Sequence, residues 1–264
     1  MKYKFIILIA LIALIVLSCS KDNVTNNPVV PETHNYFTMT PGSWWKMEHY
    51  TLDNNQNKID TSRYVDSIYS GEKIAYQGQN ANVQYLYYDT YPTIISYYYT
   101  NSDNSILYCN AEEIDPSIDN PEIPIVLPAG WYKIADFNST AEWTLLDSNF
   151  TNVKCTVPII GPTNMSGNYK ITCVKGTVKS ISLGEKSDTT VNAQEFILTY
   201  IFDGSIVYNF IPLKIPFKIP VHYYYADNIG LVSTMAESAT IDLTFYKYDI
   251  QGGQSRVLNY KITK

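Results

Sequence analysis

From residue 36 onward, apolar residues recur with a period of two between turn-forming residues, and this pattern constrains the fold more than any other feature. In the segment 241–246, for example, Ile241, Leu243 and Phe245 alternate with Asp242 and Thr244. Side chains of a strand point alternately to opposite faces of a sheet, so this spacing predicts strands with one buried face. No window after residue 36 shows sustained helical spacing of apolar residues. The sequence therefore predicts an all-β, predominantly antiparallel domain with few or no helices beyond the N-terminal leader.

Turn-forming residues separate the predicted strands, which run over 44–52, 62–69, 73–76, 83–89, 94–100, 105–109, 169–183, 190–202 and 241–246. A final hairpin is expected to turn at Gly252 and Gly253 and to bring the C-terminus back into the sheet. Residues 112–128 contain four prolines and no clean period. We therefore expect a single antiparallel β domain over 36–264, with the loop 111–129 as a candidate internal boundary.

The segment Ile211–His222 alternates strictly between apolar residues and a face of proline, lysine and histidine. Pro212, Pro216 and Pro220 remove backbone N–H donors along one side of such a strand. A strand without these donors pairs poorly on that side, so we predict a protected edge strand. The functional alternative is a rim or lid over an apolar cavity.

The first 18 residues have the composition of a secretory signal peptide. Lys2 and Lys4 precede an apolar run from Phe5 to Leu17, and Ser18 and Cys19 follow directly. A basic start, a short apolar run and a small residue at the cut are typical of such a leader. The run is too short to stay in the membrane, because a helix that crosses a bilayer needs about 20 residues.

The four residues Val16, Leu17, Ser18 and Cys19 resemble the lipobox of bacterial lipoproteins. The resemblance implies cleavage between Ser18 and Cys19 and a thioether-linked diacylglycerol on Cys19. A multiply acylated cysteine holds a protein on a membrane essentially permanently, because each buried methylene adds about 0.8 kcal/mol. The membrane is thus the predicted partner of Cys19. An ordinary signal peptide with a chance cysteine is the alternative.

Residues 19–35 read as the lipidated cysteine followed by a flexible tether rich in Asn, Thr and Pro. Lys21 and Asp22 resemble the start of the tether of Bacteroidota lipoproteins, where such residues often accompany export to the cell surface. No aspartate directly follows Cys19, so the usual inner-membrane signal of enterobacteria is missing. We therefore predict outer-membrane attachment, on either the periplasmic face or the cell surface. The alternative is a solvated linker that contains no sorting signal.

Charge and cysteine content exclude some functions. The whole chain carries a formal net charge of −6, and removal of two leader lysines makes the mature chain more acidic. Nucleic acid is therefore not an expected partner. The mature chain contains three cysteines in addition to Cys19, namely Cys109, Cys155 and Cys173, and no two of them form a CxxC motif. One bridge between Cys155 and Cys173, the closest pair in sequence, and buried free thiols are both compatible with an exported protein.

Several short passages resemble a group of uncharacterised bacterial lipoproteins. They are the opening Tyr36–Trp45, the central Trp131–Phe137 with Trp143, the strand 191–200, and a closing motif made of Tyr225, Ala226, Ile229, Gly230, Leu231 and Val232. The resemblance implies a curved antiparallel sheet, akin to the half-barrels of lipoprotein carriers, and it implies no known activity. Asn192 and Ala193 depart from the usual residues of the group. The alternative fold is a two-sheet β-sandwich.

Common catalytic, phosphate and zinc motifs are missing from the chain. It contains no GxSxG, P-loop, HExxH, GxGxxG or CxxC pattern. Asp53, Asn55 and Asn57 copy the first ligands of a calcium loop, but Lys58 stands at the glycine position. We therefore predict no enzyme, cofactor or metal site. If the protein were a hydrolase, two acidic residues of the loop 112–119 would be the candidate catalytic pair. The two carboxylates of a glycosidase need a defined distance in space but no fixed spacing in the sequence.

Tyrosine is over-represented, at 24 residues against 9 phenylalanines. A tyrosine can lie half buried with its hydroxyl in water, which suits both an exposed sheet face and a ligand-binding surface. The leading hypothesis is a non-enzymatic outer-membrane lipoprotein that binds an apolar ligand or an envelope protein. Adhesion or glycan binding is the alternative. The ligand-binding residues are not predicted.

Overall fold

The computed structural model describes residues 34–88, 91–114, 127–157, 161–208, 211–242 and 247–264, and residues His34–Lys264 form one compact unit. Within these residues, strands dominate and the only helical elements are two single 3₁₀ turns, η1 (Asp60–Ser62) and η2 (Ala111–Glu113). No helix of the described part is long and apolar enough to cross a bilayer. The predicted all-β class is confirmed. The leader, Cys19 and the tether up to Thr33 lie outside the described residues.

The N-terminal half of the domain is a meander of antiparallel strands. The strands are β1 (Trp44–Leu52), β2 (Tyr64–Ser70), β3 (Ile74–Tyr76), β4 (Gln79–Tyr88), β5 (Tyr91–Thr100), β6 (Ile106–Asn110) and β7 (Trp131–Asp136). Each strand pairs with the next, except that β2 pairs directly with β4 while β3 folds back on β4.

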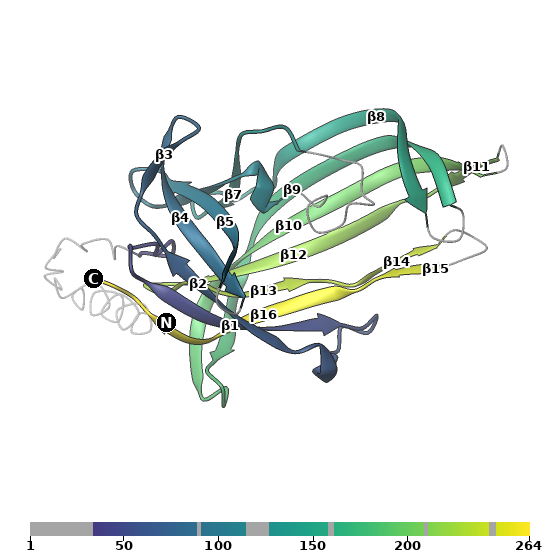
Figure 1. Cartoon of the computed structure of the whole chain (residues 1–264). Helices are drawn as coiled ribbons and strands as arrows, with labels where there is room; N and C mark the ends of the chain where they lie inside the picture. Colours follow the sequence, from purple (N-terminus) through teal and green to yellow (C-terminus); the bar gives the residue numbers. More distant parts are fainter. Residues whose placement is uncertain (1–33, 89–90, 115–126, 158–160, 209–210, 243–246) are drawn as a thin grey trace, which may run out of the picture. The chain divides into compact units, whose positions relative to one another are not determined.

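The C-terminal half is a second meander of longer strands. They are β8 (Trp143–Val157), β9 (Gly161–Leu183), β10 (Thr189–Tyr208), β11 (Ile211–Lys214), β12 (Phe217–Ala226), β13 (Gly230–Ala236), β14 (Ala239–Asp242), β15 (Lys247–Ile250) and β16 (Gly252–Lys261). Strands β14 and β15 form a separate two-stranded sheet that extends from β13 and β16 (Figure 1).

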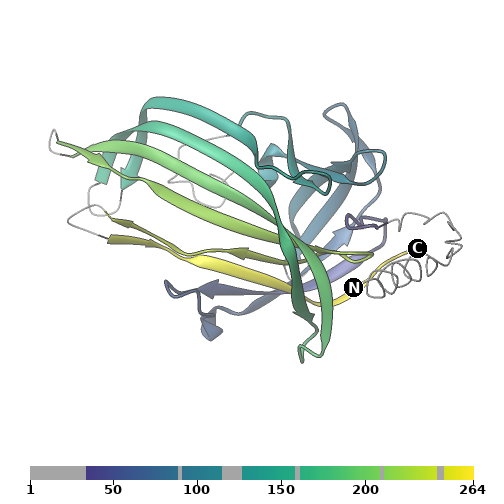
Figure 2. The same ribbon diagram turned by 180° about the vertical axis from the view of Figure 1, so that it is seen from behind.

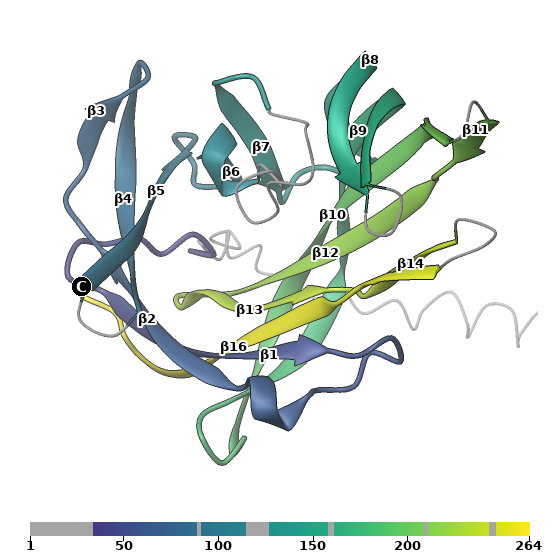
Figure 3. The same ribbon diagram turned by 45° about the vertical axis from the view of Figure 1, so that its right-hand side comes forward.

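The two meanders join through the first and last strands into one 14-stranded sheet. Strand β1 pairs with β16 over its whole length, from Trp44 opposite Lys261 to Leu52 opposite Gly252. The sheet curves until its two outer strands, β7 and β8, approach each other (Figure 3). A nearly closed, curved antiparallel sheet is therefore confirmed, rather than the two-sheet sandwich.

Side chains close the gap between β7 and the β8–β9 pair. The Trp143 indole donates to the carbonyl of Lys133 at 2.7 Å, and the Lys175 ammonium donates to that of Phe137 at 2.6 Å. The Cys173 thiol lies 3.2 Å from the carbonyl of Ile134. These bonds satisfy backbone acceptors that a neighbouring strand would otherwise have to pair.

The long β9–β10 hairpin bends and its distal half crosses β13 and β16, as seen from behind in Figure 2. A register shift occurs at Glu195, between Gln194 and Phe196. Such a bulge bends a strand pair and increases its twist. The tip then contacts β16, where the Gly184 N–H donates to the Val257 carbonyl at 3.2 Å.

The prediction of one continuous strand over 211–222 is wrong. The segment divides into β11 and β12 at Ile215 and Pro216, and both parts pair with β10. Ile215 is buried in the core at the break between the two strands. Its packing interrupts the strand although apolar and polar residues alternate regularly through the segment. The prediction of an edge strand is also wrong for β12, which pairs with β10 on one side and, from Val221 onward, with β13 on the other. The Pro220 carbonyl accepts from Glu237, so the Pro220 nitrogen faces away from β10.

The predicted turn at Gly252 and Gly253 is also wrong, because both glycines lie in β16 opposite β1. The chain reverses instead between the paired strands β14 and β15, whose connection lies outside the described residues. A Cβ on Gly252 would lie 2.6 Å from the Ser238 nitrogen. Glycine is therefore required there for close backbone approach, not for a reversal.

Candidate functional site

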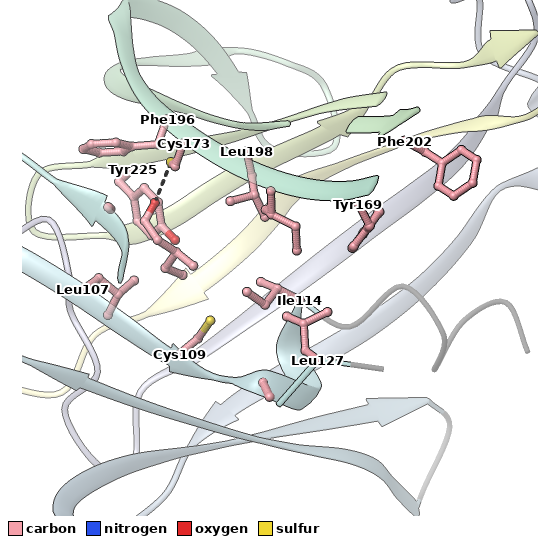
Figure 4. Packing of buried hydrophobic residues seen from close by; sticks show 14 of the residues in the cluster. Leu107, Cys109, Ile114, Leu127, Tyr169, Cys173, Phe196, Leu198, Phe202 and Tyr225 are labelled. Carbon is pink, nitrogen blue, oxygen red and sulfur yellow. Dashed lines mark hydrogen bonds between the residues drawn. The ribbon is translucent and has the colours of Figure 1, made fainter. Parts of the chain in front are cut away.

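The concave side of the sheet is filled by the chain's own side chains. Phe196 and Leu198 of β10 lie across the cluster from Leu107 and Cys109 of β6, and Phe202 lies further along β10, all of them 3% exposed or less (Figure 4). Ile114 and Leu127, at the two described ends of the loop 111–129, pack into the same cluster (Figure 4). An apolar sheet face must be covered, and here residues of this loop contribute to the cover.

The enclosed space that remains is small. The cavity between the N-terminal segment and the sheet has a volume of about 40 Å³ and is lined by Phe37, Met39, Trp45 and Tyr225 among others. Pockets for small-molecule ligands usually measure about 300 Å³ or more. This cavity is therefore too small for an apolar ligand.

The segment His34–Met39 closes one end of the core and is fixed by the β12–β13 turn. The Asp227 carboxylate accepts from the Asn35 N–H at 2.7 Å, and the Asn228 N–H donates to the Asn35 carbonyl at 2.9 Å. Gly230 has φ +94°, and a Cβ there would lie 3.3 Å from the Thr38 carbonyl. The Trp45 indole donates to the Ile229 carbonyl at 2.8 Å. The opening and closing motifs of the sequence thus meet in space.

Of the two alternatives left open for the cysteines, the structure agrees with free thiols and not with a bridge between Cys155 and Cys173, because Cys109, Cys155 and Cys173 are all free. On the β8–β9 pair, Cys155 lies opposite Thr163 whereas Cys173 lies opposite Trp143. Ten residues of an extended strand therefore separate the two positions, roughly 33 Å. Closeness in sequence does not bring the two thiols together, because they lie far apart along a single long hairpin.

The three histidines do not meet, and each contacts a carboxylate instead. His34 pairs with Asp227 at 3.0 Å and His49 with Asp66 at 2.9 Å. His222 lies between Glu195 at 2.9 Å and Glu237 at 3.0 Å. Among the described residues, no group of three His, Cys, Asp or Glu side chains could hold a metal ion.

The strongest candidate site is an aromatic surface on the outer face of β2 to β7, which we call the tyrosine face. It consists of Tyr69, Tyr76, Tyr85, Tyr87, Tyr97, Tyr99, Tyr108 and Trp131. Tyr97 and Tyr99 flank the core residue Tyr98 on β5, so alternation places their rings on the opposite face from the core. Registers then align Tyr69 with Tyr85 and Tyr99 with Tyr108.

The rings of the tyrosine face contact one another across the strands. Tyr76 stacks on Tyr97 with ring centroids 3.9 Å apart, and Tyr99 stacks on Tyr108 at 4.4 Å. Trp131 stands perpendicular to Tyr99 at 4.8 Å, and its indole donates to the Gln77 carbonyl at 3.1 Å. These contacts fix the rings in place, so little rotamer freedom remains to be lost on binding.

The tyrosine face is partly exposed and carries little charge. Tyr69 is 42% exposed, and Ile95 between the rings is 44% exposed. Burial raises the pKa of the Tyr97 hydroxyl, with a smaller contribution from Tyr76, and burial also raises that of Tyr99. Both hydroxyls therefore stay protonated at neutral pH and can donate hydrogen bonds. The surface offers flat apolar rings edged by neutral donors.

Sequence reasoning noticed the excess of tyrosine but named no residue of this face. The signal was present as alternation in β5, where Ile95, Tyr97 and Tyr99 occupy every second position. The two faces of such a strand are both aromatic, so the pattern alone does not say which one is buried.

No protein-family model matches the chain, and no curated protein sequence matches it. Two solved structures align with it. One is a predicted lipoprotein from Parabacteroides distasonis, with 11% sequence identity and a TM-score of 0.40 over 87% of this chain and 100% of that one. The other is a predicted exported protein with a YmcC-like fold from Bacteroides fragilis, with 9% identity and a TM-score of 0.37 over 86% of this chain and 99% of that one.

Proposed function

We propose that this chain is a lipid-anchored lipoprotein of the outer membrane whose tyrosine face binds a neutral glycan. The observation that carries the proposal is the contiguous set of fixed, half-exposed aromatic rings on the outer face of β2 to β7. Exposed apolar patches of this kind mark interaction sites. The membrane attachment is supported by the order of Val16, Leu17, Ser18 and Cys19 in the sequence.

A glycan fits this surface better than an apolar ligand does. Sugar rings present C–H groups on their faces and hydroxyls at their edges, which match tyrosine rings and phenolic hydroxyls respectively. Five neighbouring strands, β2 and β4 to β7, contribute to the face. At about 4.8 Å per strand, this gives a length of roughly 19 Å, which suits an oligomer rather than a single sugar.

The carrier hypothesis is the second candidate, and the interior argues against it. The cavity lined by Phe37, Trp45 and Tyr225 measures about 40 Å³, which is too small for an acyl chain. An acyl chain would have to displace Ile114 and Leu127, which are 2% and 4% exposed in the core.

Binding to a panel of soluble and immobilised neutral polysaccharides tests the glycan proposal. We expect at least one to bind residues 20–264, and Tyr97→Ala with Tyr99→Ala to weaken it by about tenfold or more, as for central aromatic residues of interfaces. Tyr260→Ala is the matched control, because Tyr260 is a 37% exposed tyrosine on β16, outside this face. Unchanged affinity of the double variant, or no binding to any polysaccharide, contradicts the proposal.

Membrane fractionation of the full chain tests the anchor separately. The wild-type protein should sediment with outer membranes, and Cys19→Ala should lose this association because no acyl chain is attached. A Cys19→Ala protein that still fractionates with membranes contradicts lipidation at this position.

A further inference from the structure

A second site lies on the outer face of the C-terminal meander, beneath the bent part of the β9–β10 hairpin. The distal hairpin packs Ile181, Leu183 and Val191 against Tyr224, Val232 and Val257. Beside this apolar contact, a cleft of about 270 Å³ remains between Ser180 and Ser182 of β9 and the strands β12, β13 and β16. Nothing in the proposed glycan binding uses this cleft.

The cleft is lined mainly by cations and hydroxyl groups. Lys58, from the loop after β1, and Arg256 of β16 supply positive charge, while Ser180, Ser182, Ser233 and Tyr224 supply hydroxyls. No carboxylate lines it among the described residues. In a chain with a net charge of −6, such a lining is unusual.

Two arginines here share one buried carboxylate, and Lys58 lies near them. Glu48 is 2% exposed, and it accepts hydrogen bonds from Arg63 Nε at 3.0 Å and from Arg256 Nε. Lys58 has no ion pair with any described carboxylate, and its ammonium lies 4.5 Å from the centre of the Tyr50 ring. Asp60 also interacts electrostatically with Lys58, so three cations face two carboxylates and the local formal charge is positive by one.

The electrostatic environment of Lys58 agrees with this excess. Partial desolvation of the Lys58 ammonium lowers its pKa, and the positive charge of Arg256 lowers it further, against smaller opposite contributions from Glu48 and Asp60. A bound anion would relieve that repulsion.

The carboxylates nearest the Tyr224 end of the cleft already have hydrogen-bond partners. Tyr224 donates to Glu195 at 3.2 Å, and His222 lies within 3.0 Å of both Glu195 and Glu237. An anion is thus directed to the Lys58 and Arg256 end, with its hydroxylated part toward Tyr224.

We propose that the cleft beneath the β9–β10 hairpin binds a small hydroxylated molecule that carries an oxyanion, such as a sugar phosphate. Lys58 and Arg256 hold the oxyanion, because guanidinium and ammonium donors form strong charge-assisted hydrogen bonds to such groups. The serine and tyrosine hydroxyls bind the sugar-sized remainder.

Isothermal titration calorimetry of residues 20–264 tests this site with glucose 6-phosphate, inorganic phosphate and glucose as probes. Glucose 6-phosphate should bind, inorganic phosphate should bind more weakly, and glucose should not bind. Affinity should fall as salt rises, because screening weakens the ion pairs. No measurable binding of glucose 6-phosphate, or equal binding of glucose, overturns the proposal.

The variant Lys58→Gln should weaken glucose 6-phosphate binding by about tenfold, the effect of losing roughly 1.4 kcal/mol. Lys58 is exposed and makes no ion pair with a described residue, so the fold should be kept, as circular dichroism can check. Lys186→Gln at the exposed hairpin tip is the matched control and should bind as the wild type does. Equal affinity of Lys58→Gln and the wild type overturns the proposal.

Discussion

Glu48 shows how a single residue fixes the outer face of this sheet. Burial alone would raise the pKa of its carboxyl, but hydrogen bonds and charges from Arg256 and Arg63 outweigh burial and hold the pKa below its ordinary value. Because the folded protein favours the ionised form, Glu48 contributes stability above the ordinary glutamate pKa of about 4.3. That contribution is lost as the pH falls through the lower pKa of the folded state.

The variant Glu48→Gln should therefore be less stable than the wild type at pH 7, by about 1 to 3 kcal/mol, since two charge-assisted hydrogen bonds are weakened. The difference should shrink as the pH falls below about 4.3, because the wild-type carboxylate becomes protonated. Urea denaturation of both proteins across this pH range measures the difference.

Glu185→Gln is the control, because the Glu185 side chain is 73% exposed and lies 3.8 Å from Lys46. Removal of such a surface pair should cost less than about 1 kcal/mol. A stability difference between wild type and Glu48→Gln that stays constant down to pH 3 would show that the ionised carboxylate is not the cause.

Residue-level contacts of this kind were not predictable from the sequence. Glu48 and Arg256 are 208 positions apart and become neighbours only because β1 pairs with β16. The four residues that resemble a lipobox are different, because they are adjacent in the chain and the pattern can be recognised without the fold. The sequence could therefore predict Cys19 as a site but not the tyrosine face or the cleft at Lys58.

At the scale of elements, the bend of the β9–β10 hairpin creates the cleft, and Gly176 allows this bend. Glu195 in the bulge is 6% exposed and is held by His222 at 2.9 Å and Tyr224 at 3.2 Å. A Cβ on Gly176 would contact the Glu195 carboxylate and lie 2.9 Å from its Cδ. Glu195 cannot move away without breaking these hydrogen bonds.

Gly176→Ala should accordingly destabilise the domain by about 1 to 3 kcal/mol, the usual cost of overpacking a filled site. Gly130→Ala provides the comparison, because a Cβ on Gly130 has no neighbour within 4 Å. That substitution should stay within about 0.5 kcal/mol of the wild type in urea denaturation. Equal stability of the two variants would mean that the bulge tolerates a side chain at Gly176.

Strands with a local signal were predicted best. The predicted strand 44–52 coincides with β1, and the pairs β2–β4 and β5–β6 lie within a few residues of the predicted ranges. The predictions for the segment 211–222 and for the glycines at 252 and 253 were wrong. A proline or glycine in the sequence is compatible with a strand break, a bulge or a turn, and the sequence does not distinguish them. Packing of Ile215 and the approach of Ser238 to Gly252 decide these cases.

At the scale of the whole domain, pairing of β1 with β16 makes one curved sheet from two meanders. Alternation predicts that each strand has a buried face, but it carries no information on which distant strands pair. The curvature follows from the pairing order and the bulges. The cover on the concave face comes from Ile114, Leu127 and the segment that contains Phe37 and Met39.

We propose that the domain fills its own concave side and binds partners on its outer faces. A native mass spectrum of residues 20–264, purified from a bacterial periplasm, tests this claim most directly. We expect the mass of the bare polypeptide, because Ile114, Leu127 and the segment that contains Phe37 and Met39 pack against the concave face. Additional mass that disappears on organic extraction would show an apolar ligand inside the sheet and would contradict the account.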